Sequence, residues 1–253
     1  IAISLLISEV VSSVYINDLN PSIYAFWYSV LNCNDELCQR IEDVKVDMDE
    51  WYAQRAIQGN VDCSLIDLAF STFFLNRTNR SGIINGGVIG GKEQLGNFKI
   101  DARFNKKDLI SRIKVISKLK NKITLTRQDA ADFILKKLPE IPKRSLVYLD
   151  PPYYVKGKGL YQNHYGHADH EEISELVGSI QQSWVVTYDN VSPICNMYKN
   201  FCKQTFALKY SVQKRYSGTE ILISKNGLIL PNNVISSRAL KLGGGVEVPS
   251  EYQ

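Results

Sequence analysis

The sequence lacks the features of several large protein classes. Its five cysteines are an odd number and form no C-x-x-C pair, which argues against a disulfide framework or a zinc site and favours reduced thiols in the cytoplasm. No uninterrupted apolar run reaches the roughly 18 residues that a membrane span needs. The apolar stretch at residues 1–16 contains Glu9 and lacks a basic start and a small-residue cleavage site, so we expect no signal peptide and no membrane partner.

The sequence also has little net charge and no internal repeat. Lys+Arg 30 against Asp+Glu 26 gives a formal net charge of +4 over 253 residues. That excess is compatible with a polyanionic partner but does not require one. Hydrophobic residues make up 44% and charged residues 22%, which excludes a disordered or collagen-like chain. The length suits one large domain or a core domain with a smaller insert.

The first half of the chain predicts helices and one short strand. Residues 1–11 have the spacing of a buried helix, residues 14–16 are strand-like, and Asn20 before Pro21 is suited to cap an aromatic helix. Further on, helical patterns surround a segment with six glycines between Gly82 and Gly96, which has few apolar residues to bury. We expect an exposed hairpin or loop there, and such loops often carry function.

The second half of the chain alternates strands with helices, which predicts an α/β fold with a mostly parallel sheet and helices on both faces. We therefore divide the chain into four parts. Residues 1–33 and 121–240 are two parts of one core domain, residues 34–120 are an insert, and residues 241–253 are a flexible tail.

The strongest chemical signal is the motif Asp150-Pro151-Pro152-Tyr153, which directly follows the apolar strand SLVYL. Ligands of open α/β sheets bind at the carboxyl ends of strands, and this motif lies at such an end. Two successive prolines give a rigid turn. The turn presents a carboxylate, a backbone carbonyl and an aromatic face together, although an ordinary strand-ending turn would also contain Asp-Pro.

This set of groups suits a flat base that carries an exocyclic amine. Asp150 and the Pro151 carbonyl can accept the two N–H bonds of the amine, and Tyr153 can stack on the ring. Accepting both hydrogens disfavours delocalisation of the nitrogen lone pair into the ring. The amine then becomes a better nucleophile towards an electrophilic methyl group.

The motif and its neighbours resemble the Dam-type N6-adenine DNA methyltransferases, the family whose catalytic motif is DPPY. Several further segments match in the same order, so the resemblance covers most of the chain. They are VYINDLNP (14–21), FFLNRTNRSGIINGG (73–87), RFNKKDLISRI (103–113), ITLTRQDAADFI (123–134), LVYLDPPYY (146–154), WVVTYDN (184–190) and YSGTEILISKN (216–226).

The resemblance implies both fold and activity. The fold is a Rossmann-like class I methyltransferase fold, with a mostly parallel sheet, one reversed strand near the C-terminus and a helical and hairpin target-recognition insert. The activity is direct transfer of a methyl group from S-adenosylmethionine to the N6 amine of an adenine flipped out of double-stranded DNA. A cognate restriction endonuclease is a further expected partner, and the protein is expected in the cytoplasm, encoded by a bacterium or a phage.

The resemblance also assigns cofactor residues. Asp18, at the end of a strand, matches the acidic residue that holds the ribose hydroxyls, and an acidic strand end is a usual ribose ligand. Its alternative is a cap for the next helix. Asp129 matches the residue that contacts the cofactor adenine, with Asp132 as its rival and a helix cap as the alternative. The resemblance also assigns Asp150 and Pro151 to cofactor binding. Together with Pro152 and Tyr153, they form the catalytic motif of the family.

The candidate DNA contacts lie in the glycine-rich segment and in the basic helix that follows it. Cations suit phosphates or guanine edges, and asparagines suit adenine edges. Alternatively, Asn76 and Arg77 hold the segment itself, and the basic helix has only a solvated charged face. The full set of candidates is Asn76, Arg77, Asn79, Arg80, Asn85, Lys92, Lys106 and Lys107.

Three histidines, His164, His167 and His170, have the spacing of a metal cluster, but we expect no metal. A zinc site needs a fourth ligand and closed geometry, whereas Asp169 here is suited to cap a helix. Residues 155–167 suit a mobile lid over the flipped base. Tyr188, Asp189 and Asn190 end another strand at the same sheet edge, and we expect them to help shape the base pocket.

One family feature is absent from these 253 residues. The resemblance implies a glycine-rich cofactor loop, and the sequence begins at the helix expected to follow it. Either a preceding segment is missing, or the chain is a non-catalytic DNA-binding subunit or a degenerate relative. Methylation of RNA, of cytosine N4 or of a free amine, and a generic nucleotide-binding role, also stay open.

Overall fold

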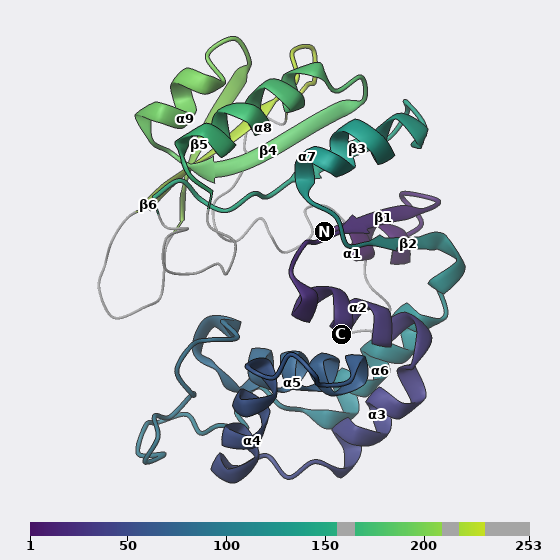
Figure 1. Cartoon of the computed structure of the whole chain (residues 1–253), viewed down its shortest axis with the longest axis vertical. Helices are drawn as coiled ribbons and strands as arrows, with labels where there is room; N and C mark the ends of the chain where they lie inside the picture. Colours follow the sequence, from purple (N-terminus) through teal and green to yellow (C-terminus); the bar gives the residue numbers. More distant parts are fainter. Residues whose placement is uncertain (156–164, 209–217, 231–253) are drawn as a thin grey trace. The chain divides into compact units, whose positions relative to one another are not determined.

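The computed structural model describes residues 1–155, 165–208 and 218–230 as a mixed α/β chain (Figure 1). The chain divides after Ala130 into two compact units. The α/β class is therefore confirmed. The predicted division into four parts stays a prediction, and its tail at 241–253 lies outside the described residues.

The first unit is mainly helical. Its elements in chain order are α1 (Ala2–Ile7), β1 (Val14–Asn17), α2 (Pro21–Asn32), α3 (Asn34–Asp43), α4 (Met48–Gln58), α5 (Leu65–Thr78), the 3₁₀ turn η1 (Arg80–Gly82), α6 (Lys106–Ser117), the 3₁₀ turn η2 (Lys120–Lys122) and β2 (Ile123–Thr126). Strands β1 and β2 pair in parallel over their whole length, from Val14 opposite Ile123 to Asn17 opposite Thr126.

Local capping signals set several helix starts in this unit. The side chain of Asn20 accepts hydrogen bonds from the N–H groups of Ser22 and Ile23, at 2.8 and 3.4 Å, which confirms the predicted cap before Pro21. Asn105 caps the basic helix α6 in the same way, through the N–H of Asp108. These caps satisfy donors that the first helical turn leaves without partners.

Helix α5 is the centre of the hydrophobic core of this unit. It is buried along most of its length and packs against α2 and α4, while α3 packs against α6. Phe73, Phe74 and Phe104 form a cluster of aromatic rings. The ring centroid of Phe104 lies 5.6 Å from that of Phe73 and 5.5 Å from that of Phe74. A core of this kind fixes the helices that carry the neighbouring loop.

The glycine-rich segment after α5 is a loop rather than a hairpin. Residues 80–105 are all described, and they contain turns but no strand, with one isolated bridge between Asn79 and Val88. The hairpin expected in the insert is therefore not observed. A ladder needs alternating apolar residues, which this segment lacks, and Val88 and Ile100 instead hold the loop to the core individually.

The second unit is a sheet with helical crossovers. Its elements are α7 (Ala130–Asp132) at the boundary, the π turn η3 (Phe133–Lys137), the 3₁₀ turn η4 (Leu138–Glu140), β3 (Leu146–Leu149), α8 (His167–Ser179), β4 (Ser183–Asp189), α9 (Ser192–Met197), β5 (Cys202–Leu208) and β6 (Gly218–Ser224). Helix α8 connects β3 to β4, and α9 connects β4 to β5 (Figure 1).

The strand order of this sheet is β3-β4-β6-β5. Strands β3 and β4 are parallel, and β6 is antiparallel to both of its neighbours, so three strands share one direction and β6 is the reversed strand expected near the C-terminus. The described residues form this sheet and the two-stranded β1–β2 sheet separately. A single Rossmann-like sheet thus stays a prediction.

Strand β4 forms the middle of the second core. All of its residues after Ser183 are buried, and Trp184 and Tyr188 are fully buried beside Tyr198. Strand β6 contributes the buried Ile221 and Ile223. In the part of the chain that the structure describes, no helix combines the length and apolarity needed to cross a membrane.

Candidate active site

The motif at the end of β3 forms a turn whose carboxylate is held by the neighbouring strand. The register pairs Leu149 with Val186, so the next residue, Asp150, lies beside Thr187 of β4. The Thr187 hydroxyl donates to Asp150 Oδ1 at 2.9 Å. Tyr148 and Thr187 hydroxyl oxygens are 3.1 Å apart, and because Thr187 gives its one hydrogen to Asp150, Tyr148 is the donor of this second bond.

The electrostatic surroundings of Asp150 favour its neutral form more than water does. Burial of its carboxyl group raises the pKa of Asp150, the hydrogen bond from Thr187 opposes that shift, and the charge of Glu220 adds to it. Glu220 is itself buried on β6. The residue Asp150 as a whole nevertheless keeps an exposed surface.

The rest of the motif is partly buried and continues into a segment that β4 also holds. Pro151, Pro152 and Tyr153 each have intermediate exposure. The next two amides, of Tyr154 and Val155, donate to the carboxylate of Asp189, the last residue of β4. The motif is therefore bordered on both sides by hydrogen bonds to one strand.

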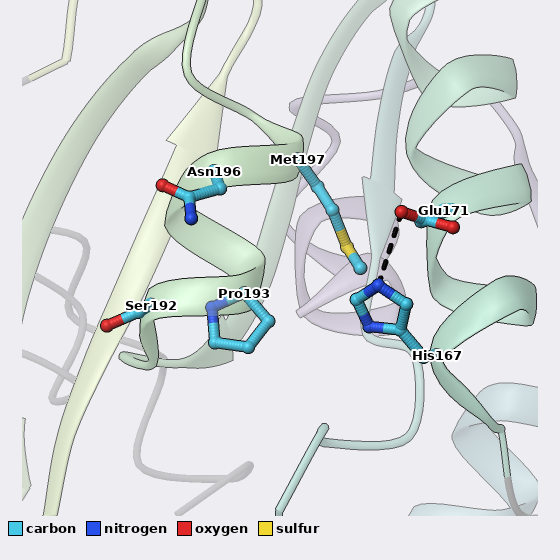
Figure 2. A pocket seen from close by; sticks show the side chains of 6 residues that line it. All are labelled: His167, Glu171, Ser192, Pro193, Asn196 and Met197. Carbon is cyan, nitrogen blue, oxygen red and sulfur yellow. Dashed lines mark ion pairs between the residues drawn. The ribbon is translucent and has the colours of Figure 1, made fainter.

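A surface pocket of about 440 Å³ lies next to this segment, between α8 and α9 (Figure 2). His167 Nε2 lies 3.2 Å from Glu171 Oε1 on its α8 wall, and the other wall comes from α9. His167 Nδ1 is also 2.9 Å from the Tyr154 hydroxyl, which connects this pocket wall to the segment that directly follows the motif. Its full lining is His167, Glu171, Ser192, Pro193, Asn196 and Met197.

The histidines of this region make contacts within the protein. His170 is buried, with Nδ1 3.1 Å from the Tyr188 hydroxyl, and His164 lies outside the described residues, as does most of the expected lid. Within the described ranges, no group of three or more His, Cys, Asp or Glu side chains is arranged to hold a metal ion. The five cysteines, all described, have free thiols.

The predicted cofactor carboxylates of the first unit lie at one edge of the β1–β2 sheet. Asp18 directly follows β1, and its Oδ1 accepts the N–H of Asn20 at 2.8 Å. Asn20 and not Asp18 caps α2, so the capping alternative for Asp18 is wrong. Burial raises the pKa of Asp18, and the Asn20 N–H opposes the shift. A half-buried carboxylate at a strand end is a suitable acceptor for hydroxyl groups.

Asn17 holds the segment that carries Asp129 against the same edge. Its Oδ1 accepts from the Gln128 N–H at 3.0 Å and from the Thr126 hydroxyl at 2.8 Å, and its Nδ2 donates to the Gln128 carbonyl. Asp129 follows directly and precedes α7. The rival residue Asp132 instead pairs with Lys136 at 2.6 Å. The choice between Asp129 and Asp132 as the cofactor contact stays a prediction, and the role of Asn17 was not predicted.

A family model for D12 class N6 adenine-specific DNA methyltransferases matches residues 2–217. The chain belongs to this family. The match confirms the resemblance to Dam-type enzymes, and it establishes the general reaction as adenine-N6 methylation of DNA, with S-adenosylmethionine implied as cofactor. No curated protein matches the chain.

Three of the DNA contacts predicted for this methyltransferase have structural roles. Asn79 is 0% exposed, and its amide accepts the Trp51 indole N–H at 2.7 Å and donates to the carbonyls of Ile83 and Ile84. We therefore do not retain Asn79 as a DNA contact. The Asn76 amide donates to the Gly82 carbonyl, and Arg77 Nε donates to the Arg103 carbonyl, as the structural alternative expected.

The remaining candidates differ in exposure. Arg80, Asn85, Lys92 and Lys107 are exposed. Lys106 is half-buried and its ammonium group donates to the Glu42 carbonyl. The exposed four are thus the candidates whose side-chain position suits contact with DNA.

Two exposed apolar residues of this loop were missed by sequence reasoning. Leu95 is 85% exposed and Phe98 is 73% exposed. The loop that carries them is well fixed, because the Gln94 side chain donates to the Ile89 and Gly91 carbonyls and accepts the Ile100 N–H. The sequence signal that could have indicated their exposure is the presence of large apolar side chains in a glycine-rich, polar segment.

Proposed function

We propose that this chain transfers a methyl group from S-adenosylmethionine to the N6 amine of adenine in double-stranded DNA, at the turn formed by Asp150, Pro151, Pro152 and Tyr153. The observation that carries the proposal is the hydrogen bond from Thr187 to Asp150 Oδ1. It engages one carboxylate oxygen and leaves the other to accept an N–H of the base.

The residues of the turn act by position and polarisation. Asp150 Oδ2 and the Pro151 carbonyl accept the two amine hydrogens, which directs the nitrogen lone pair out of conjugation with the ring. Tyr153 stacks on the base after it has flipped out of the duplex. Catalysis then consists of alignment for direct displacement, with the amine held at the site where positive charge develops.

The residues of the first unit fit the cofactor. Asp18, half-buried and with one oxygen already engaged, would accept the ribose hydroxyls, and Asp129 would contact the adenine ring. S-adenosylmethionine, when bound, supplies an electrophilic methyl group on a sulfonium. A Rossmann-like, mostly parallel sheet whose carboxyl strand ends bind ligands is the fold that we propose for this reaction.

The exposed face of the glycine-rich loop would bind the DNA. Arg80, Lys92 and Lys107 would contact phosphates or guanine edges, and Asn85 would read an adenine edge. A cytoplasmic setting and a cognate restriction endonuclease complete the proposal.

Calorimetric titration with S-adenosylmethionine tests this function first. We expect saturable binding that Asp18→Ala weakens about tenfold or more, since a charge-assisted hydrogen bond contributes roughly 1.5–3 kcal/mol. Asp132→Ala is the matched control and should bind as the wild type does, because Asp132 pairs with Lys136. DNA binding without any cofactor binding would favour the alternative of a non-catalytic DNA-binding subunit.

A further inference from the structure

Strand β4 is longer than the strand that carries the catalytic motif. Its pairing with β3 ends at Val186 opposite Leu149, and β4 then continues through Thr187, Tyr188 and Asp189. Successive side chains of a strand point to opposite faces, so Thr187 and Asp189 share one face. Both are buried, and both contact the segment that follows β3.

Asp189 makes an unusual pair of contacts with that segment. Its Oδ1 accepts the Tyr154 N–H at 2.9 Å and its Oδ2 accepts the Val155 N–H at 2.8 Å, while the residue is only 4% exposed. Hydrogen bonds to an ionised acceptor are roughly twice as strong as neutral ones. A buried carboxylate is costly without partners, and both of these partners are consecutive amides of one segment. The carboxylate is therefore satisfied only when that segment occupies this position.

The two β4 side chains hold the catalytic turn from its two ends. Thr187 fixes the side chain of Asp150 at the start of the motif, and Asp189 fixes the backbone directly after Tyr153. We propose that Asp189 is a positioning residue for methyl transfer, which holds Tyr153 and the Pro151 carbonyl in the geometry that the flipped base requires. This inference rests on the proposed function.

Asp189 acts through the turn and not on the substrate. Both of its oxygens are engaged by backbone amides and the side chain is almost fully enclosed, so it offers no surface to a base or to a cofactor. Its loss should therefore lower the rate of transfer and leave substrate binding nearly unchanged. Misplacement of a reacting group by about 1 Å can lower a rate by about a hundredfold.

Asp189→Asn tests the proposal with little change of shape. The amide keeps one acceptor, and its NH₂ group faces a backbone N–H that it cannot bond. We expect kcat for duplex DNA to fall about tenfold to a hundredfold, with KM for DNA and Kd for S-adenosylmethionine within about twofold. We also expect the amide hydrogens of Tyr154 and Val155 to exchange faster. Asp189→Glu retains the charge and should restore part of kcat.

Ser183→Ala is the control, because it truncates an exposed side chain at the other end of β4, away from the segment that Asp189 holds. It should leave both kcat and the exchange of the two amides unchanged. An unchanged kcat or unchanged amide exchange in Asp189→Asn would overturn the proposal, as would a parallel loss of cofactor binding, DNA binding and thermal stability. A wild-type chain that transfers no methyl group would contradict the proposed function. The comparison of amide hydrogen exchange needs no activity, so it would still test the contact of Asp189 with the turn.

Discussion

At the scale of single residues, the candidate site contains carboxylates whose surroundings disfavour their charge. Burial raises the pKa of both Asp18 and Asp150, and each is opposed by only one hydrogen bond. Such groups lower the stability of the fold at neutral pH, and perturbed groups of this kind are concentrated at functional sites. The effect of these carboxylates on stability can therefore be measured without an activity assay.

Asp150→Asn should stabilise the protein at neutral pH. The folded-state pKa of Asp150 lies above its ordinary value of 3.8, so its contribution to stability is fully present below pH 3.8 and is lost as the pH rises through the folded-state value. Asparagine has no charge to bury, and its side-chain oxygen can still accept the hydrogen bond from Thr187. Thermal unfolding at pH 7 should show a melting temperature about 1–3 °C higher, and the gain should vanish at a pH below 3.8. A lower melting temperature at pH 7 would contradict this reading.

Thr187→Val should reduce methyl transfer by about tenfold, since one hydrogen bond to a charged group is lost. The Thr187 bond lowers the pKa of Asp150, so its removal raises that pKa further. Because the ionised carboxylate is the acceptor, the acidic limb of the pH–rate profile should move to higher pH. Thr205→Val, an exposed threonine on β5, is the control. If the rate of methyl transfer falls but the acidic limb of the pH–rate profile does not move, the assigned hydrogen bond from Thr187 to Asp150 would be contradicted.

At the scale of elements, local signals predicted more than distant ones. The cap at Asn20 and the strand before Asp150 follow from neighbouring residues and were predicted, whereas the reversed strand β6 was expected from the family resemblance. Asn79 and Asn85 have similar sequence surroundings, yet only Asn79 is buried. The difference comes from Trp51, which lies 28 residues away in the chain and donates its indole N–H to Asn79. Contacts of this kind have no local signal.

Asn79→Ala should destabilise the protein by about 2–4 kcal/mol, because it leaves the Trp51 N–H and two buried carbonyls without partners. Asn85→Ala is the matched control, since Asn85 is exposed in the same loop, and its change should be within about 0.5 kcal/mol. Urea unfolding measures both. If Asn85→Ala weakens binding to duplex DNA without loss of stability, its proposed role in DNA recognition is supported. Equal effects of the two substitutions on stability would contradict the assignment of Asn79.

At the scale of the whole molecule, each of the two compact units carries candidate residues of its own. Asp18 and Asp129 lie at the carboxyl edge of the β1–β2 sheet in the first unit, and the catalytic turn lies at the carboxyl end of β3 in the second. The sequence predicted that acidic residues follow strands in both halves of the chain, and the roles of these residues stay predictions. The contacts of Thr187 and Asp189 were beyond prediction, since they depend on how far β4 extends past β3.

The central claim is methyl transfer to adenine N6 at Asp150, and one assay tests it directly. The chain is incubated with duplex DNA and S-adenosylmethionine that carries a labelled methyl group, and the DNA is then digested to nucleosides. We predict labelled N6-methyladenine from the wild type and none from Asp150→Ala, with similar affinity of both proteins for the duplex. A wild-type chain that binds the duplex but yields no labelled N6-methyladenine would contradict the claim, as would label found on cytosine instead.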